Sequence, residues 1–320
     1  MDLSVIVPVY NAQATLAGTL DSLLAQKADF PWEIVAVDDG STDESLSILS
    51  DYEKKAAAQN LSLRVFTGPN QGVGRTRNRG LQESRGQCVT YLDADDTLLP
   101  GSLSRAMTEK KERGARILVF DSQILFPDGQ AKPFPASPHP GGAMSLRDYM
   151  LSLPCPWNKI VDRDVFFENH LFFEEGIWYE DLALIPALGC ACSPGAIYYL
   201  KETLHSYYQS ESSIMRSPYT EKKLDIFPAL SALRKNAPGH LLEVEYLTWL
   251  HLYRNFVWIF WQAGKTEELR KMNLYMKERF PHWKKNPLVR EKHTAKERWI
   301  AGLIYGGHFN LLRLWKGQAQ

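Results

Sequence analysis

Short apolar runs alternate with amphipathic segments over the first hundred residues of the chain. The runs are rich in β-branched side chains and are bounded by turn residues, which predicts buried strands over residues 3–9, 33–37, 63–66 and 87–92. Helices are predicted between them over residues 15–26, around Leu46, Ile48 and Leu49 after a cap at Thr42 or Asp43, and over 72–84. Strands that alternate with helices imply right-handed crossovers and a mostly parallel sheet flanked by helices. The pattern therefore predicts an α/β fold.

Polar clusters follow three of the predicted strands directly. They are Tyr10-Asn11, Asp38-Asp39-Gly40 and Asp93-Ala94-Asp95. In open α/β sheets, ligands bind beyond the carboxyl ends of the strands. We therefore expect the three clusters to converge on one crevice.

The third cluster carries the most distinctive chemistry. Asp93, Asp95 and Asp96 place three carboxylates within four residues, and alternation puts Asp93 and Asp95 on one side of the chain. Like charges this close repel, so a shared cation is expected. Oxygen ligands suit Mg²⁺ or Mn²⁺, which keep open positions for substrate phosphates. The alternative is an acidic turn that caps a helix near residues 98–102.

The second cluster and a later segment rich in glycine and arginine favour a nucleotide. Asp39 can accept hydrogen bonds from a nucleobase or a ribose hydroxyl, although Asp-Asp-Gly-Ser-Thr is also a good turn. The segment 70–80 is rich in glycine and arginine, which brings positive charge to a helix start that can approach an anion. Because Arg75, Arg77 and Arg79 alternate along one helix, only one or two of them can face the crevice.

After about residue 218 the pattern becomes helical, with helices predicted over 241–261, 266–280 and 295–315. The chain has no net charge, yet residues 265–320 carry +8 and the remainder −8. Two interpretations stay open: a helical subdomain packed around its own apolar face, or a basic, tryptophan-bearing face that lies on an anionic membrane.

The remaining composition excludes several classes of protein. The four cysteines have neither zinc-like spacing nor a dense disulfide pattern. The start of the chain has no basic region typical of a signal peptide, and the aromatic run 256–261 is far shorter than the roughly 20 residues of a spanning helix. We expect a cytoplasmic protein, at most peripheral at the inner face of the plasma membrane, that does not bind nucleic acid.

Four motifs, in order and spacing, resemble family 2 glycosyltransferases of bacterial cell-surface polysaccharides, which have the GT-A fold. The resemblance is strong over about residues 1–105 and rests on residues 4–11, 37–43, 70–78 and 92–96. It implies a GT-A domain over 1–215, with a nucleotide-sugar half at about 1–105 and an acceptor half at about 106–215. A helical subdomain would follow over 216–320.

The resemblance also implies roles for individual residues. Asp39 would bind the nucleoside, Asp93 the ribose region, and Asp95, with help from Asp93, a Mn²⁺ or Mg²⁺ ion that bridges two phosphates. The other residues implied for nucleotide-sugar binding are Pro8, Tyr10, Asn11, Asn70, Gly72, Arg77 and Ala94.

The acceptor side is implied by two later segments. Residues 172–183 resemble the family's Glu-Asp motif, in which Asp181 would be the catalytic base; capping of the helix over 182–188 is the alternative. The residues implied for the acceptor or sugar pocket are Trp157, Asn158, Lys159, Trp178 and Glu180. His205 is a weaker metal-ligand candidate, since a lone strand histidine is often structural. It opens a segment similar to one that closes over the phosphates, but Ser210 stands where the family often has arginine.

These observations predict an inverting, metal-dependent hexosyltransferase. It would move a sugar from a nucleoside-diphosphate donor, with UDP as the expected nucleotide, to a hydroxyl of a glycan or lipid-linked acceptor. A sugar-1-phosphate nucleotidyltransferase is one alternative, but it should carry a glycine-rich loop after the first strand, and residues 8–12 contain no glycine. A non-catalytic sugar- or nucleotide-binding scaffold protein is the other.

Overall fold

The computed structural model describes residues 1–209 and 218–315. The chain divides into two compact units, Met1–Ser213 and Ile214–Gln320. Each unit has its own architecture.

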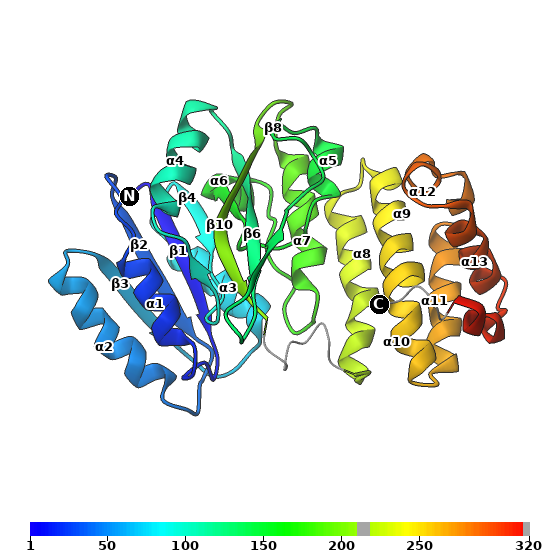
Figure 1. Ribbon diagram of the computed structural model, residues 1–320, viewed down its shortest axis with the longest axis horizontal. Coiled ribbons are helices and arrows are strands. Elements are labelled where there is room, and N and C mark those ends of the chain that lie inside the picture. Colours follow the sequence, from blue (N-terminus) through cyan, green and yellow to red (C-terminus); the bar gives the residue numbers. More distant parts are fainter. Residues whose placement is uncertain (210–217, 316–320) are drawn as a thin grey trace. The chain divides into compact units, whose positions relative to one another are not determined.

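The first unit is built on a ten-stranded mixed sheet (Figure 1), with strands in the order β3-β2-β1-β4-β9-β6-β10-β5. The first four of these strands are parallel, and their bounds are β1 Leu3–Val9, β2 Trp32–Asp38, β3 Ser62–Thr67 and β4 Cys88–Tyr91. The later strands are β5 Thr97–Leu98, β6 Ile117–Leu125, β7 Ala131–Phe134, β8 Gly142–Ala143, β9 Lys159–Asp162 and β10 Ile197–Tyr208.

The predicted mostly parallel sheet is confirmed. Strand β9 is antiparallel to both β4 and β6, so β6 and its parallel neighbour β10 run in the same direction as the first four strands. The carboxyl ends of these six strands therefore lie at one edge of the sheet.

Helices cover both faces of this sheet and enclose two apolar cores. One core packs α1 (Leu16–Leu24), α2 (Ser45–Ala58) and α4 (Ser102–Glu112) against one face. The other packs α3 (Val73–Glu83), α5 (Leu146–Met150), α6 (Arg163–Glu168) and α7 (Glu180–Leu188) against the opposite face. Alternation along β1 explains the division, because Val5 and Val7 enter the first core while Ile6 enters the second.

Helix α2 shows where the sequence pattern misleads. Asp43, not Thr42, binds its first turn: Asp43 Oδ1 accepts from the Ser45 N–H at 3.0 Å. Leu46, expected on the apolar face, is exposed. The buried face is formed by Ser45, Leu49, Tyr52 and Ala56.

The second unit is helical, as expected. Its helices are α8 Ile226–Asn236, α9 Leu241–Trp249, α10 Val257–Gln262, α11 Thr266–Arg279, α12 Pro287–Lys292 and α13 Ala295–Tyr305. A π-helical turn over Leu250–Phe256 joins α9 to α10, and 3₁₀ turns occur at Glu221–Asp225, Trp283–Lys285 and Phe309–Trp315. The predicted single helix over 295–315 is wrong, because Gly307 has a positive φ of 84° and α13 ends at Tyr305.

The apolar face of the second unit packs within that unit. Tyr253, Phe256, Val257 and Phe260 are all buried. Among the described residues, none of the helices combines the length and apolarity needed to cross a bilayer.

Candidate active site

The ends of β1 and β2 are tied together at the carboxyl edge of the sheet. Asn11, with a positive φ of 46°, accepts at Oδ1 from the Thr42 N–H at 2.8 Å and donates its own N–H to Ser41 Oγ at 2.9 Å. Tyr10 and Asn11 are exposed beside these contacts, and Pro8 is half-buried within β1. The predicted convergence of the first two polar clusters is confirmed.

Asp39 organises the loop that precedes α3. Its carboxylate is 7% exposed and accepts from the N–H groups of Gln71 at 2.8 Å and Gly72 at 2.9 Å. Gly40 has a positive φ of 72°, and a Cβ added there would lie 2.8 Å from the Asn70 nitrogen. Asp39 therefore shapes this loop, and its predicted contact with a nucleoside stays a prediction.

The acidic stretch after β4 presents alternate carboxylates to opposite sides, as the alternation predicts. Asp95 is exposed and Asp93 is half-buried, whereas Ala94 and Asp96 are buried. The pKa of Asp95 is raised to about 7 by desolvation from surrounding protein atoms and by the Asp96 and Asp93 carboxylates. A cation at this point would relieve that repulsion.

Arg77 is the buried cation of the site. Its guanidinium donates to Asp93 Oδ1 at 2.9 Å and also to Glu180 Oε1. Burial alone would lower the pKa of Arg77, but the Asp93 and Glu180 carboxylates raise it. Arg77 thus links the acidic stretch after β4 to the start of α7.

The two neighbouring arginines point elsewhere. Arg75 is exposed, with Nη1 3.8 Å from Glu175 Oε2, and Arg79 donates to the Thr67 carbonyl oxygen at 2.7 Å. Of the three arginines, Arg77 is thus the one that contacts the carboxylates of Asp93 and Glu180.

Asp181 lies in the first turn of α7, beside Glu180. Its Oδ1 accepts from the Leu182 N–H at 2.7 Å within that turn, whereas the N-cap residue is Tyr179, which makes no side-chain capping bond. Burial and the Glu180 carboxylate raise the pKa of Asp181 to about 7, against the opposing effect of Arg77. A carboxylate with this pKa is suited to accept a proton near neutral pH.

A non-glycine residue in the left-handed region precedes the Glu-Asp pair. Tyr179 has φ 66° and is the N-cap residue of α7. Trp178, half-buried beside it, packs edge-to-face on the Tyr179 ring with centroids 6.4 Å apart. No role for Tyr179 is predicted from the sequence, because a tyrosine does not indicate a positive φ.

Asn78 is a second residue to which the sequence analysis assigns no role. Its Nδ2 donates to the Phe173 carbonyl oxygen and its Oδ1 accepts from the Phe173 N–H, each at 2.9 Å. This clamp fixes α3 to the segment that leads to α7. Asn78 directly follows Arg77 in the segment 70–78 on which the family resemblance rests. This position is the sequence feature that could have indicated its structural role.

Trp157, Asn158 and Lys159 lie inside the first unit, and their predicted role in an acceptor or sugar pocket stays a prediction. Their side chains are nearly or fully buried. Lys159 Nζ donates to the carbonyl oxygens of Leu153 at 2.7 Å and Cys155 at 3.0 Å, and desolvation lowers its pKa to about 8. Lys159 thus holds the preceding loop, and Asn158 Oδ1 accepts a further hydrogen bond from its Nζ at 2.7 Å.

His205 also lies inside the protein. It is fully buried, stacks on Trp157 with ring centroids 4.4 Å apart, and places Nε2 3.2 Å from Asp96 Oδ2. Desolvation lowers the pKa of His205 to about 3. It faces the buried Asp96, and its predicted role as a metal ligand stays a prediction; Ser210 lies outside the described residues.

The donor set at the crevice suits a hard divalent ion. Within residues 1–209 and 218–315, no group of three histidine, cysteine or acidic side chains is arranged to hold a metal alone. Asp95 and Asp93 supply oxygen atoms only, and the remaining positions would have to come from a ligand such as a diphosphate.

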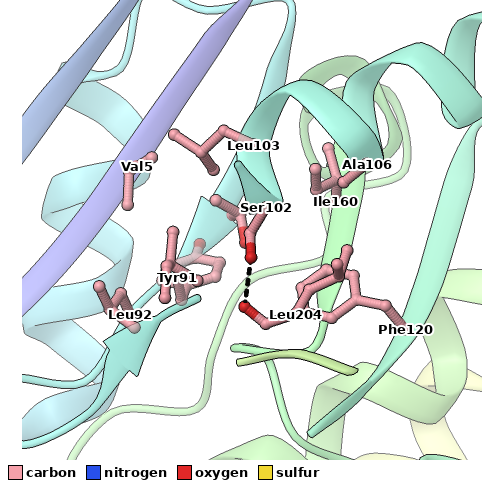
Figure 2. Close-up of a pocket in the computed structure, with 11 residues that line it drawn as sticks. Val5, Tyr91, Leu92, Ser102, Leu103, Ala106, Phe120, Ile160 and Leu204 are labelled. Carbon is pink, nitrogen blue, oxygen red and sulfur yellow. Dashed lines mark hydrogen bonds between the residues drawn. The ribbon is translucent and has the colours of Figure 1, made fainter. Parts of the chain in front are cut away.

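The enclosed space inside the first unit is not the site. Figure 2 shows a small apolar cavity of about 10 Å³ between β1, β4 and α4, where Ser102 Oγ donates to the Leu204 carbonyl oxygen at 2.7 Å. It has room for no more than about one water molecule. The polar residues at the strand ends, around Asp39, Arg77 and Asp95, form the candidate active site.

The chain is similar in sequence to known glycosyltransferases. A glucosyltransferase of Campylobacter jejuni, GalNAc(5)-diNAcBac-PP-undecaprenol beta-1,3-glucosyltransferase, is 36% identical over 178 residues, which are 54% of this chain and 55% of that protein. The poly(ribitol-phosphate) beta-N-acetylglucosaminyltransferase TarS of Staphylococcus aureus is 29% identical over 178 residues, 55% of this chain and 30% of its own. The matched segments span less than two thirds of either relative.

The fold has a solved counterpart. The crystal structure of S. aureus TarS 1–349 in complex with UDP superposes with a TM-score of 0.76 at 19% sequence identity, covering 100% of this chain and 92% of that one. The GT-A fold is thereby confirmed. The family model described as glycosyl transferase family 2 matches residues 4–166, half of the chain, and this protein belongs to that family.

Proposed function

We propose that this protein is an inverting, metal-dependent glycosyltransferase that moves a sugar from a UDP-sugar to a hydroxyl of a cell-surface glycan or lipid-linked acceptor. The observation that carries the proposal is the arrangement around Arg77. One buried guanidinium contacts Asp93, beside the exposed Asp95, and also Glu180, beside Asp181. Asp93 and Asp95 are suited to binding the donor diphosphate through a metal ion, and Asp181 is suited to accepting the acceptor proton. Arg77 thus connects the two sets of groups in one network.

The names of the relatives support this choice of reaction. The Campylobacter relative is named for glucosyl transfer to an undecaprenol-linked glycan, and the TarS relative for N-acetylglucosaminyl transfer to poly(ribitol phosphate). TarS crystals contain UDP or UDP-GlcNAc. From these relatives we infer for this protein the general class of donor and the general class of acceptor.

In the proposed reaction the acceptor hydroxyl attacks the anomeric carbon from the side opposite the diphosphate. A carbon–oxygen bond forms to the acceptor as the bond to the diphosphate oxygen breaks, and the hydroxyl proton passes to the Asp181 carboxylate. A divalent ion held by Asp95 and Asp93 would neutralise charge on the departing diphosphate. Arg77 holds Asp93 and Glu180 in place, and Asp39 holds the loop of Asn70 and Gly72 against which the nucleoside would lie.

The domain division follows from the same proposal. We assign donor and acceptor binding to residues 1–215 and a separate supporting role to residues 216–320. The reaction would take place at the inner face of the plasma membrane.

Substitution at the two acidic positions tests the reaction. Asp95→Ala should abolish metal-dependent hydrolysis of a UDP-sugar and transfer from it. Asp181→Asn should lower transfer at least about 100-fold, the contribution expected of a general base, while UDP binding measured by calorimetry stays within a factor of about two.

The alternatives predict different results. A nucleotidyltransferase would release pyrophosphate from a nucleoside triphosphate and a sugar 1-phosphate, and a scaffold protein would turn over no donor. Turnover of the UDP-sugar that both substitutions leave unchanged would refute the proposal.

A further inference from the structure

An open groove of about 560 Å³ lies on the second unit. It runs between α13 and the turn that precedes α12. We call it the basic groove, and it is lined by Trp283, Lys284, Arg290, Arg298, Trp299, Gly302, Leu303, Gly306 and His308. The reaction proposed above uses none of these residues.

The charge of the basic groove has one sign. Lys284, Arg290 and Arg298 line it, and none of its lining residues is acidic. Within the described part of the chain, none of these three cations lies within 4.0 Å of a carboxylate, whereas the nearby Arg254 pairs with Glu297 at 3.3 Å. The groove therefore keeps a net positive charge that a ligand could neutralise.

The guanidinium groups of the groove are held by backbone oxygens. Arg298 Nη1 donates to the carbonyl oxygens of Arg290 at 2.9 Å and His293 at 2.6 Å. Arg290 Nε donates to the Lys284 carbonyl oxygen at 3.3 Å. Because these acceptors are neutral, they fix the two arginine side chains without cancelling their charge. The two side chains therefore lose less conformational entropy when a ligand binds.

An aromatic surface lies among these cations. Trp299 is 59% exposed, which is unusual for the largest apolar side chain. Gly302, one helical turn farther on, leaves room beside Lys284, since a Cβ there would lie 3.5 Å from Nζ. Cations and an indole face along one concavity match a chain that alternates anionic groups with carbon-rich sugar or polyol units.

We propose that the basic groove binds an anionic glycan chain, such as a phosphodiester-linked polyol, as a second contact for the acceptor. This inference rests on the proposed function, because it takes the acceptor to be an extended polymer. A concave groove favours a chain over a flat membrane surface, which would meet its rim only. A second contact raises the effective concentration of the polymer at the enzyme.

Binding of a short poly(glycerol phosphate) oligomer to the full chain tests the proposal. Lys284→Glu/Arg290→Glu should weaken binding at least about tenfold, as expected for two reversed ionic contacts, and Trp299→Ala should weaken it several-fold. Lys235→Glu/Lys271→Glu reverses two exposed lysines of the same unit outside the groove and should change affinity less than about twofold. Circular dichroism verifies the fold of each variant.

The two proposals fail in distinguishable ways. Hydrolysis of a UDP-sugar should be the same in the groove variants as in the unmodified protein, and oligomer binding should be kept in Asp181→Asn. Equal weakening by both charge-reversal pairs would show unspecific attraction and overturn the groove proposal. Groove-dependent binding to phosphatidylglycerol vesicles, with no binding of the oligomer, would overturn it in favour of a membrane surface.

Discussion

Arg77 sets the chemistry of the crevice because one planar cation faces two carboxylates. Its two terminal nitrogens donate to Asp93 and Glu180 at the same time. The single ammonium group of a lysine could contact both carboxylates only poorly. Glu180 in turn raises the pKa of Asp181. The position of one side chain thus affects both acidic motifs.

Replacing Arg77 by lysine should therefore be costly although the charge is kept. We expect the free energy of unfolding to fall by about 1–3 kcal/mol, because one buried carboxylate loses its charged partner. Urea denaturation followed by circular dichroism measures this. The exposed Arg75→Lys is the matched control and should change stability by less than about 0.5 kcal/mol; equal losses in the two variants would contradict the role given to Arg77.

The raised pKa of Asp181 predicts a pH profile. A base acts in its deprotonated form, so transfer should increase as the pH rises through about 7 and level off above it. A titration midpoint near the ordinary value for aspartate, about 4, would show that a different group limits the rate. The profile should be recorded as kcat/KM with a saturating divalent ion, so that ionisation of Asp95 does not obscure it.

At the scale of elements, the site depends on how closely α3 approaches the segment before α7. Gly74 lies in α3, and a Cβ added there would lie 2.3 Å from the Glu174 carbonyl oxygen. No L-residue with a side chain fits this contact without a shift of the backbone. The glycine is thus required by close packing and not by its φ angle.

Gly74→Ala should consequently move α3 away from residues 174–180 and disturb both contacts of Arg77. We expect a loss of stability of about 1–3 kcal/mol, in the range for overpacking, together with reduced transfer. Gly18→Ala is the control: Gly18 lies in α1 with no atom near its added Cβ, so alanine should stabilise by up to about 1 kcal/mol. Thermal unfolding of the two variants should show shifts of opposite sign.

The elements best predicted from sequence are those with the simplest environment. Strands β1, β2 and β4 are buried on both faces almost throughout, and β3 is partly buried; continuous apolar runs identify all four within one residue of their ends. Polar residues at strand ends also predicted the crevice. Burial of Lys159 and His205 could not be predicted, because it depends on loops and strands that meet only in three dimensions. From sequence alone, a polar side chain in a motif is equally consistent with a ligand contact.

At the scale of the molecule, a bound donor should stabilise the fold. UDP with Mn²⁺ at about 100 times its dissociation constant should add about 2.7 kcal/mol to the free energy of unfolding. Differential scanning fluorimetry should show a higher Tm with both ligands, little change with Mn²⁺ alone, and loss of the shift after chelation by EDTA. Asp95→Ala should lose this stabilisation, and Lys284→Glu/Arg290→Glu should keep it; a shift that survives chelation would contradict a metal-bridged diphosphate.

The place of β10 in the sheet has a consequence for synthesis of the chain. This strand is inserted between β6 and β5 and pairs with β6 from Ile197 to Tyr208, well beyond the last residue of the family match at 166. At about 5–20 residues per second, a ribosome needs roughly 4–16 s to pass from Ile117 of β6 to its partner position Ile197 in β10. During that interval β6 has an open edge able to pair with other nascent chains, so a fragment ending near residue 166 should aggregate where the longer chain does not.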